Sequence, residues 1–77
     1  MRLEIITPDQ VVFDGEISRV QFPGDTGSFE VLSNHAPMIA TVRQGSIKVV
    51  NTNGEAQEFE LAPGFVEVRD NQVTALD

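Results

Sequence analysis

Turn-forming residues recur at short intervals along this chain of 77 residues, and their spacing constrains the fold more than any other feature. No interval between them has the length of a typical helix. The chain is therefore expected to consist of short strands joined by turns. In chain order the turn signals are Pro8-Asp9, Asp14-Gly15, Pro23 to Gly27, Ser33-Asn34, Gln44-Gly45, Asn51 to Gly54, Pro63-Gly64 and Asp70-Asn71.

Between these signals, apolar and polar residues alternate, as in strands with one buried face. Leu3 and Ile5, for example, alternate with Arg2 and Glu4. The pattern returns in residues 19–22, 28–31, 46–49, 58–61 and 66–69. Roughly nine such strands must cover their apolar faces against one another, which predicts an all-β, antiparallel two-layer sandwich or flattened barrel.

The length of the chain predicts one domain, residues 1–77, because a smaller core could not offset the entropy of ordering the chain. Within that domain, Asn53-Gly54 tolerates the positive φ angles of a type I′ turn and is expected to close an antiparallel hairpin.

Composition excludes several classes of partner and site. The chain has no Cys, which rules out disulfides and thiolate chemistry and fits a reducing compartment. Its formal net charge is -7 and its five cations are scattered, which argues against nucleic acid and anionic membrane surfaces as partners. The N-terminus shows no apolar stretch of signal-peptide or membrane-spanning length, so we expect a soluble protein without lipid insertion.

His35 is the only histidine, and an acid–base enzyme would have to depend on it. Ser33 lies two residues away, but nothing in the sequence specifies the carboxylate and geometry that a hydrolase triad needs. A lone His with scattered Asp and Glu also lacks the ligand spacing of a metal site. His35 is therefore interpreted as a structural or interface residue. For the chain as a whole, we expect no catalytic residue, no metal and no cofactor.

The glycine-rich segment from Pro23 to Ser28 resembles a phosphate-binding loop only superficially. It lacks the lysine of a P-loop, and a strand-like segment, 29–31, follows where a helix would have to begin. We interpret it as a surface loop between two strands, which can still serve as a contact site.

The segment from Ser33 to Ala40 is the most unusual part of the chain. Pro37 has no amide hydrogen for a sheet, so it is expected to begin a strand or lie at an edge, with Asn34 and His35 in the preceding turn. Residues 38–42 are almost continuously apolar. This run predicts either a strand covered on both faces or one whose outer face meets a partner.

Three function classes remain for a small β-sandwich of this composition. A lipoyl or biotinyl carrier displays its lysine at a hairpin tip, whereas Lys48, the only lysine, lies inside a predicted strand. An enzyme would rest on His35 alone. A subunit or adaptor domain needs no chemistry and is favoured.

The order of motifs along the chain resembles the epsilon subunit of the F-type ATP synthase. The most specific of them are the NHAP segment that begins at Asn34 and the GFVEV segment that begins at Gly64. The resemblance covers practically the whole chain. Its motifs are LEIITP (3–8), VVFDG (11–15), FPG (22–24), GSFEVL (27–32), NHAPMIA (34–40), GSI (45–47), GFVEV (64–68) and VTAL (73–76).

The resemblance implies a flattened antiparallel β-sandwich of about ten short strands. It also implies a non-catalytic rotor subunit in the central stalk that joins the gamma subunit to the c-ring, with neither a cofactor nor a small-molecule substrate. The complex would lie at the cytoplasmic face of the bacterial inner membrane. By resemblance, the gamma-facing residues are Thr7, His35, Ala36, Pro37, Met38 and Ala40, and the residues facing the c-ring are Gly27, Ser28 and Glu30. The alternative is a free-standing β-sandwich adaptor with an unrelated protein partner.

The chain departs from the family pattern in two respects. Many members have an acidic residue in the position of Ser28 and a glycine in that of Glu30, which changes the expected contact with the c-ring. Members also usually continue into a C-terminal helical hairpin, whereas this sequence ends at Asp77, after its last predicted strand.

Overall fold

The computed structural model describes all residues, 1–77, and consists of strands and turns without a helix. The all-β prediction is confirmed. There are eight strands, fewer than the roughly nine or ten expected. They are β1 (Arg2–Ile6), β2 (Val11–Gly24), β3 (Gly27–Leu32), β4 (Met38–Val42), β5 (Gly45–Asn51), β6 (Ala56–Leu61), β7 (Gly64–Arg69) and β8 (Gln72–Leu76).

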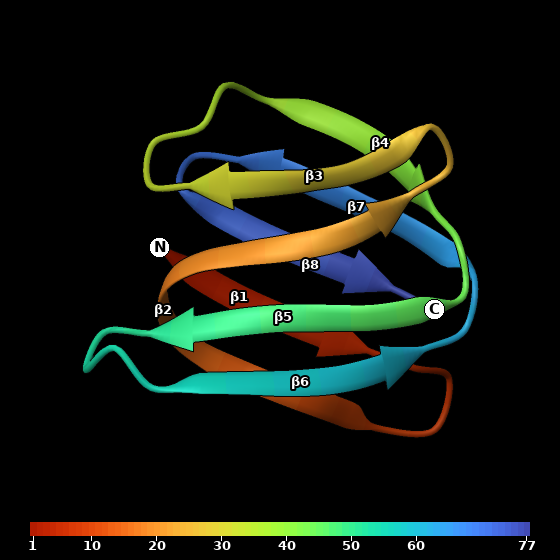
Figure 1. Ribbon diagram of the computed structural model, residues 1–77, viewed down its shortest axis with the longest axis horizontal. Helices are drawn as coiled ribbons and strands as arrows, with labels where there is room; N and C mark the ends of the chain where they lie inside the picture. The colour runs from red at the N-terminus through yellow and green to blue at the C-terminus, as the bar shows by residue number, and fades with distance from the viewer.

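The strands form two layers that face each other across one core (Figure 1). The front layer in Figure 1 contains β3, the second half of β2, β5 and β6. The rear layer contains β1, β8, β7 and β4. Because β2 also pairs with β1 and, at one position, with β4, hydrogen bonding closes around the core as in a flattened barrel.

The length of β2 explains why fewer strands form than the turn signals predicted. Asp14-Gly15 is not a turn but lies inside β2, where Gly15 pairs with Leu3 of β1. The strand changes layer at Ser18, which is an extra residue, a β-bulge, in the pairing with β5. The Ser18 hydroxyl donates to the Asn51 carbonyl at 3.1 Å. One bulged strand therefore replaces two short ones.

Pro23 and Gly24 also belong to β2, and not to a loop. Pro23 has no N–H to donate, and its carbonyl accepts from the Arg43 N–H at 2.8 Å, on the side that faces β4. The segment from Pro23 to Ser28, which was interpreted as a surface loop between two strands, is thus a tight hairpin whose loop is only Asp25-Thr26.

Two other turns fix the hairpin geometry. The hairpin at Asn53-Gly54 is confirmed, but its turn is not type I′, because only Gly54 has a positive φ, of 88°. The Gly54 N–H donates to the Asn51 carbonyl at 3.0 Å. This hydrogen bond is typical of a type I turn that is followed by a β-bulge with glycine at the residue of positive φ. A turn with two positive φ angles joins β7 to β8 instead, at Asp70 (52°) and Asn71 (59°).

One pair of strands departs from the antiparallel expectation. β1 and β8 are parallel, with Arg2 opposite Gln72 and Ile6 opposite Leu76. These are the first and last strands of the chain, so no hairpin constrains their direction. All other pairings are antiparallel.

The core is a single cluster of 14 buried apolar residues, and no polar side chain is fully buried. Its largest side chain is that of Phe22, whose ring stacks on Phe29 with centroids 5.5 Å apart. The remaining space is filled mainly by Val, Ile and Leu, as the scarcity of aromatic residues requires.

Candidate protein interface

The structure places two residues predicted to contact gamma, Thr7 and His35, at opposite ends of β1. The Asn34 N–H donates to Asn71 Oδ1 at 2.8 Å, and the Arg2 N–H donates to the Asn71 carbonyl at 3.2 Å, so the loop that holds His35 lies beside the start of β1. Thr7 follows the last residue of that strand. Five residues of strand span about 16 Å, so Thr7 and His35 do not form one contiguous patch.

His35 is half-buried in an otherwise exposed loop between β3 and β4, the turn in which the sequence predicted it. Its Nδ1–H donates to the Ala36 carbonyl at 2.7 Å, and its backbone N–H donates to the Leu32 carbonyl at 3.2 Å. Asn34, with a φ of 64°, allows the chain to turn, and Pro37 immediately precedes β4. The imidazole therefore fixes the shape of a loop and has a backbone carbonyl as its partner.

β4 has one inner and one outer face. Val42 is buried and Met38 packs against the core, whereas the side chain of Ile39 is 73% exposed. The prediction of a strand covered on both faces is therefore wrong. The alternative, an outer face that meets a partner, stays a prediction. Ala40 shares the inner side of β4 with Val42.

The hollow between β3 and β4 brings together residues predicted for two different partners. Gly27 and Ser28, predicted to face the c-ring, line it together with Met38 and Ala40, predicted to face gamma. Its volume is about 560 Å³. β3 pairs only with β2, so its edge toward β4 has no strand neighbour. These four residues thus belong to one surface and not to two.

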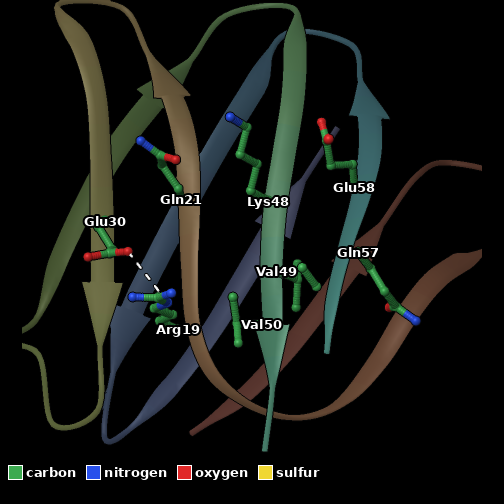
Figure 2. A pocket seen from close by; sticks show the side chains of 9 residues that line it. Arg19, Gln21, Glu30, Lys48, Val49, Val50, Gln57 and Glu58 are labelled. Atoms are coloured by element: carbon green, nitrogen blue, oxygen red, sulfur yellow. Dashed lines mark ion pairs between the residues drawn. The ribbon is translucent and has the colours of Figure 1, made fainter. Parts of the chain in front are cut away.

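Glu30, the third residue predicted to face the c-ring, points away from that hollow. Its side chain lies on the outer face of the front layer, where its carboxylate is 4.0 Å from the guanidinium of Arg19 (Figure 2). Gln21 separates this pair from Lys48, which lies opposite Glu58. Charges of both signs alternate across this face, so it favours neither sign of ligand strongly.

Lys48 lies in the middle of β5, exposed on the same face, and not at a hairpin tip. The predicted position of Lys48 inside a strand, on which the lipoyl or biotinyl carrier class was set aside, is therefore confirmed.

The charged and polar side chains form no group of three or more His, Asp or Glu that could hold a metal ion. The structure also has no helix with the length and hydropathy that a membrane crossing needs.

Comparison with known proteins places this fold in a family. The family model described as "ATP synthase, Delta/Epsilon chain, beta-sandwich domain" matches residues 1–76. Among curated relatives named ATP synthase epsilon chain, that of Nitratiruptor sp. is 37% identical over 99% of this chain and 59% of its own length. The relative from Chlorobaculum tepidum is 38% identical over 96% of this chain and 84% of its own length.

The chain thus spans between half and about four fifths of the length of these relatives, since it covers 50% of the one from Dichelobacter nodosus. Among solved structures, a chain of the Euglena gracilis mitochondrial ATP synthase superposes with a TM-score of 0.90 at 20% identity, covering 96% of this chain and 48% of that one. A chain of the Tetrahymena thermophila central stalk and c-ring gives 0.75, also at 20% identity, covering 99% and 63%. These two likenesses show the fold, and the family model shows the lineage: the chain belongs to the beta-sandwich domain family of the ATP synthase delta and epsilon chains.

Proposed function

We propose that this chain is a non-catalytic rotor subunit of the central stalk of an F-type ATP synthase, joining gamma to the c-ring and so contributing to the coupling of proton flow to ATP synthesis. The observation that carries the proposal is the family match over residues 1–76. Relatives named ATP synthase epsilon chain support it. The bacterial origin of these relatives supports a place at the cytoplasmic face of the inner membrane, as a peripheral part of the complex.

The physical properties of the fold suit such a coupling role. A subunit that transmits torque must resist shear, and two layers of paired strands around a close-packed core do so. The whole body measures 27 × 24 × 19 Å, and hydrogen bonding closes around its core. Stiffness and adhesion are sufficient for this task, and neither needs a reactive side chain.

The residues proposed to contact gamma are those that the resemblance implies: Thr7, Ala40 and the loop from His35 to Met38. The residues proposed to meet the c-ring are Gly27, Ser28 and Glu30. Because Gly27 and Ser28 share a hollow with Met38 and Ala40, the two contacts are adjacent on β3 and β4. Glu30 has an exposed carboxylate that we propose meets basic residues of the c-ring loops.

Copurification tests the proposal. The tagged chain, incubated with the cognate gamma subunit, is expected to retain gamma in a stoichiometric complex. Retention of an unrelated protein while gamma is ignored would contradict the proposal and favour the free-standing adaptor. Replacing Ala40 by a charged residue is a poor test, because Ala40 points inward and the change would also destabilise the fold.

A second measurement tests the contact with the c-ring. Glu30→Gln is expected to weaken binding of the chain–gamma complex to purified c-ring a few-fold at low salt, and raising the salt concentration is expected to remove that difference, because exposed charge contacts are screened. Glu58→Gln removes a charge from the same face and serves as the matched control. An equal effect of both variants would count against a specific role of Glu30.

A further inference from the structure

β6 forms one end of the front layer and has a free edge (Figure 1). It pairs with β5 alone, and β3 is the only other strand with a single partner. The free edge of β3 faces the hollow that β3 shares with β4, whereas β6 lies at the opposite end of the front layer. A free edge presents backbone N–H and C=O groups to which another strand can pair.

The register of β6 determines which of its backbone groups are free. The Asn51 N–H donates to the Glu55 carbonyl at 2.9 Å, so these two opposite residues form a hydrogen-bonded pair. Hydrogen-bonded and non-hydrogen-bonded pairs alternate along an antiparallel ladder. The N–H and C=O groups of Ala56, Glu58 and Glu60 therefore point away from β5, and none of the turn and loop hydrogen bonds reaches them. Each of these residues offers one donor and one acceptor to an added strand.

Charge is the only feature on this edge that restricts strand addition. β6 contains no proline, and its pairing with β5 has no bulge. The side chains of Glu58 and Glu60 are exposed on the outer face, and neither takes part in an ion pair. Glu60 accepts from the Ser46 hydroxyl at 3.2 Å, and Glu58 lies opposite Lys48 on the same face (Figure 2).

We propose that the free edge of β6 binds an extended protein segment, which adds to the front layer as a further strand and carries Lys or Arg at alternate positions. In such complexes the backbone hydrogen bonds give affinity and alternate side chains give specificity. Cations opposite Glu58 and Glu60 would pair with these carboxylates across the strands. On the inner side the added strand meets Phe59, whose half-buried ring packs edge-on against Phe13 at 5.5 Å, so apolar residues fit between the cations.

Charge disfavours a second copy of the chain as the occupant. Two β6 edges that pair along their full length would place Glu58 opposite the same residue of the second copy, and each copy has a net charge of -7. The glutamates thus keep copies of the chain apart and leave the backbone groups to a basic segment. β6 contains none of the residues proposed to contact gamma or the c-ring, so this partner is additional to them and does not depend on the proposed function.

A synthetic peptide of alternating lysine and valine is the probe, and the same peptide with glutamate in place of lysine is its control. Amide hydrogen exchange of the chain, followed by NMR, is expected to show saturable protection of Ala56, Glu58 and Glu60 as the lysine peptide is added. The amides of β3 are expected to exchange at an unchanged rate. The glutamate peptide is expected to protect neither strand.

Glu58→Pro tests the backbone contact. Proline is tolerated at an edge position whose N–H faces outward, so this variant is expected to fold and to raise the Kd of the lysine peptide about 10-fold or more, because the donor is lost and the ring obstructs the added strand. Gln57→Pro is the matched control for the register: the Gln57 N–H faces β5, so this variant is expected to unfold at a lower temperature than Glu58→Pro. The double variant Glu58→Gln with Glu60→Gln keeps every backbone donor and is expected to raise the Kd a few-fold, at low salt only.

Four results would overturn the proposal. The first is that the lysine peptide leaves the β6 amides unprotected or protects β3 equally. The second is equal binding of the lysine and glutamate peptides, which would show that charge does not select the partner. The third is wild-type affinity of Glu58→Pro, which would place the peptide on the outer face and not on the edge. The fourth is a lower stability of Glu58→Pro than of Gln57→Pro, which would contradict the register of the free groups.

Discussion

Phe22 fills the centre of the core, and replacing it by alanine measures how far the two layers depend on one ring. The side chain is fully buried and stacks on Phe29 at 5.5 Å. Truncating a buried Phe to Ala costs about 3–5 kcal/mol, to which the lost ring pair contributes about 0.5–1.5 kcal/mol. At about 0.05–0.15 kcal/mol per residue, a chain of this length has roughly 4–12 kcal/mol of stability in total. The substitution therefore removes a quarter of the stability at the least.

Phe65→Ala is the matched comparison, because the chemical change is identical and the ring is 47% exposed. About half of a Phe side chain's burial energy is at stake there, or roughly 1 kcal/mol. Urea unfolding followed by circular dichroism is the suitable assay, since the chain has no Trp or Tyr for fluorescence. With a slope of about 1 kcal/mol/M, the midpoint falls about 3 M or more for Phe22→Ala and about 1 M for Phe65→Ala. Equal shifts would refute the assignment of these two rings to the core and to the surface.

Two further substitutions test the backbone. A Cβ on Gly24 would lie 2.6 Å from the Gly27 carbonyl oxygen, so Gly24→Ala is expected to lower the free energy of unfolding, measured by thermal unfolding, by about 1–3 kcal/mol. Gly15→Ala is the control, because a Cβ on Gly15 meets nothing closer than 3.6 Å. An equal loss of stability in both variants would argue against this explanation. Asn71→Ala loses the acceptor of the Asn34 N–H and places alanine at a φ of 59°, so amide exchange at that N–H is expected to accelerate. Asn71→Asp keeps the acceptor and is expected to preserve protection; exchange that is the same in both variants would contradict the role of this hydrogen bond.

Local patterns predicted most of the strands but not their boundaries. The alternation of apolar and polar residues was sufficient to identify the strand segments, because it reflects burial of one face. The turn signal at Asp14-Gly15 was misleading, since pairing of Gly15 with Leu3 holds that dipeptide in a strand. Pro23 was also wrongly expected in a loop. It fits within β2 because β3 needs no hydrogen-bond donor at that position, so the missing N–H of Pro23 breaks no hydrogen bond between the two strands. Such long-range pairing is not encoded in a local window.

The candidate surfaces were predictable only where they are continuous in sequence. The loop and strand from Asn34 to Ala40 form one segment, and the sequence identified it as unusual. By contrast, the strand registers align Val11, Ile6, Leu76 and Phe65 across the outer face of the rear layer, and each of these is an ordinary apolar residue in its own segment. Only the pairing of the strands reveals that they are neighbours.

The parallel pairing of β1 with β8 has a consequence for synthesis of the protein. β8 lies between β1 and β7, so the rear layer has a gap until residues 72–76 leave the ribosome. Until then β1 and β7 both present open backbone edges, and we expect the charged side chains of Arg2, Glu4 and Glu67 on these strands to disfavour pairing with a second chain. Pairing of β1 with β8 joins residues about 70 positions apart in the chain. Contacts between residues so far apart in sequence form slowly, so we expect closure of the rear layer to be a late step in folding.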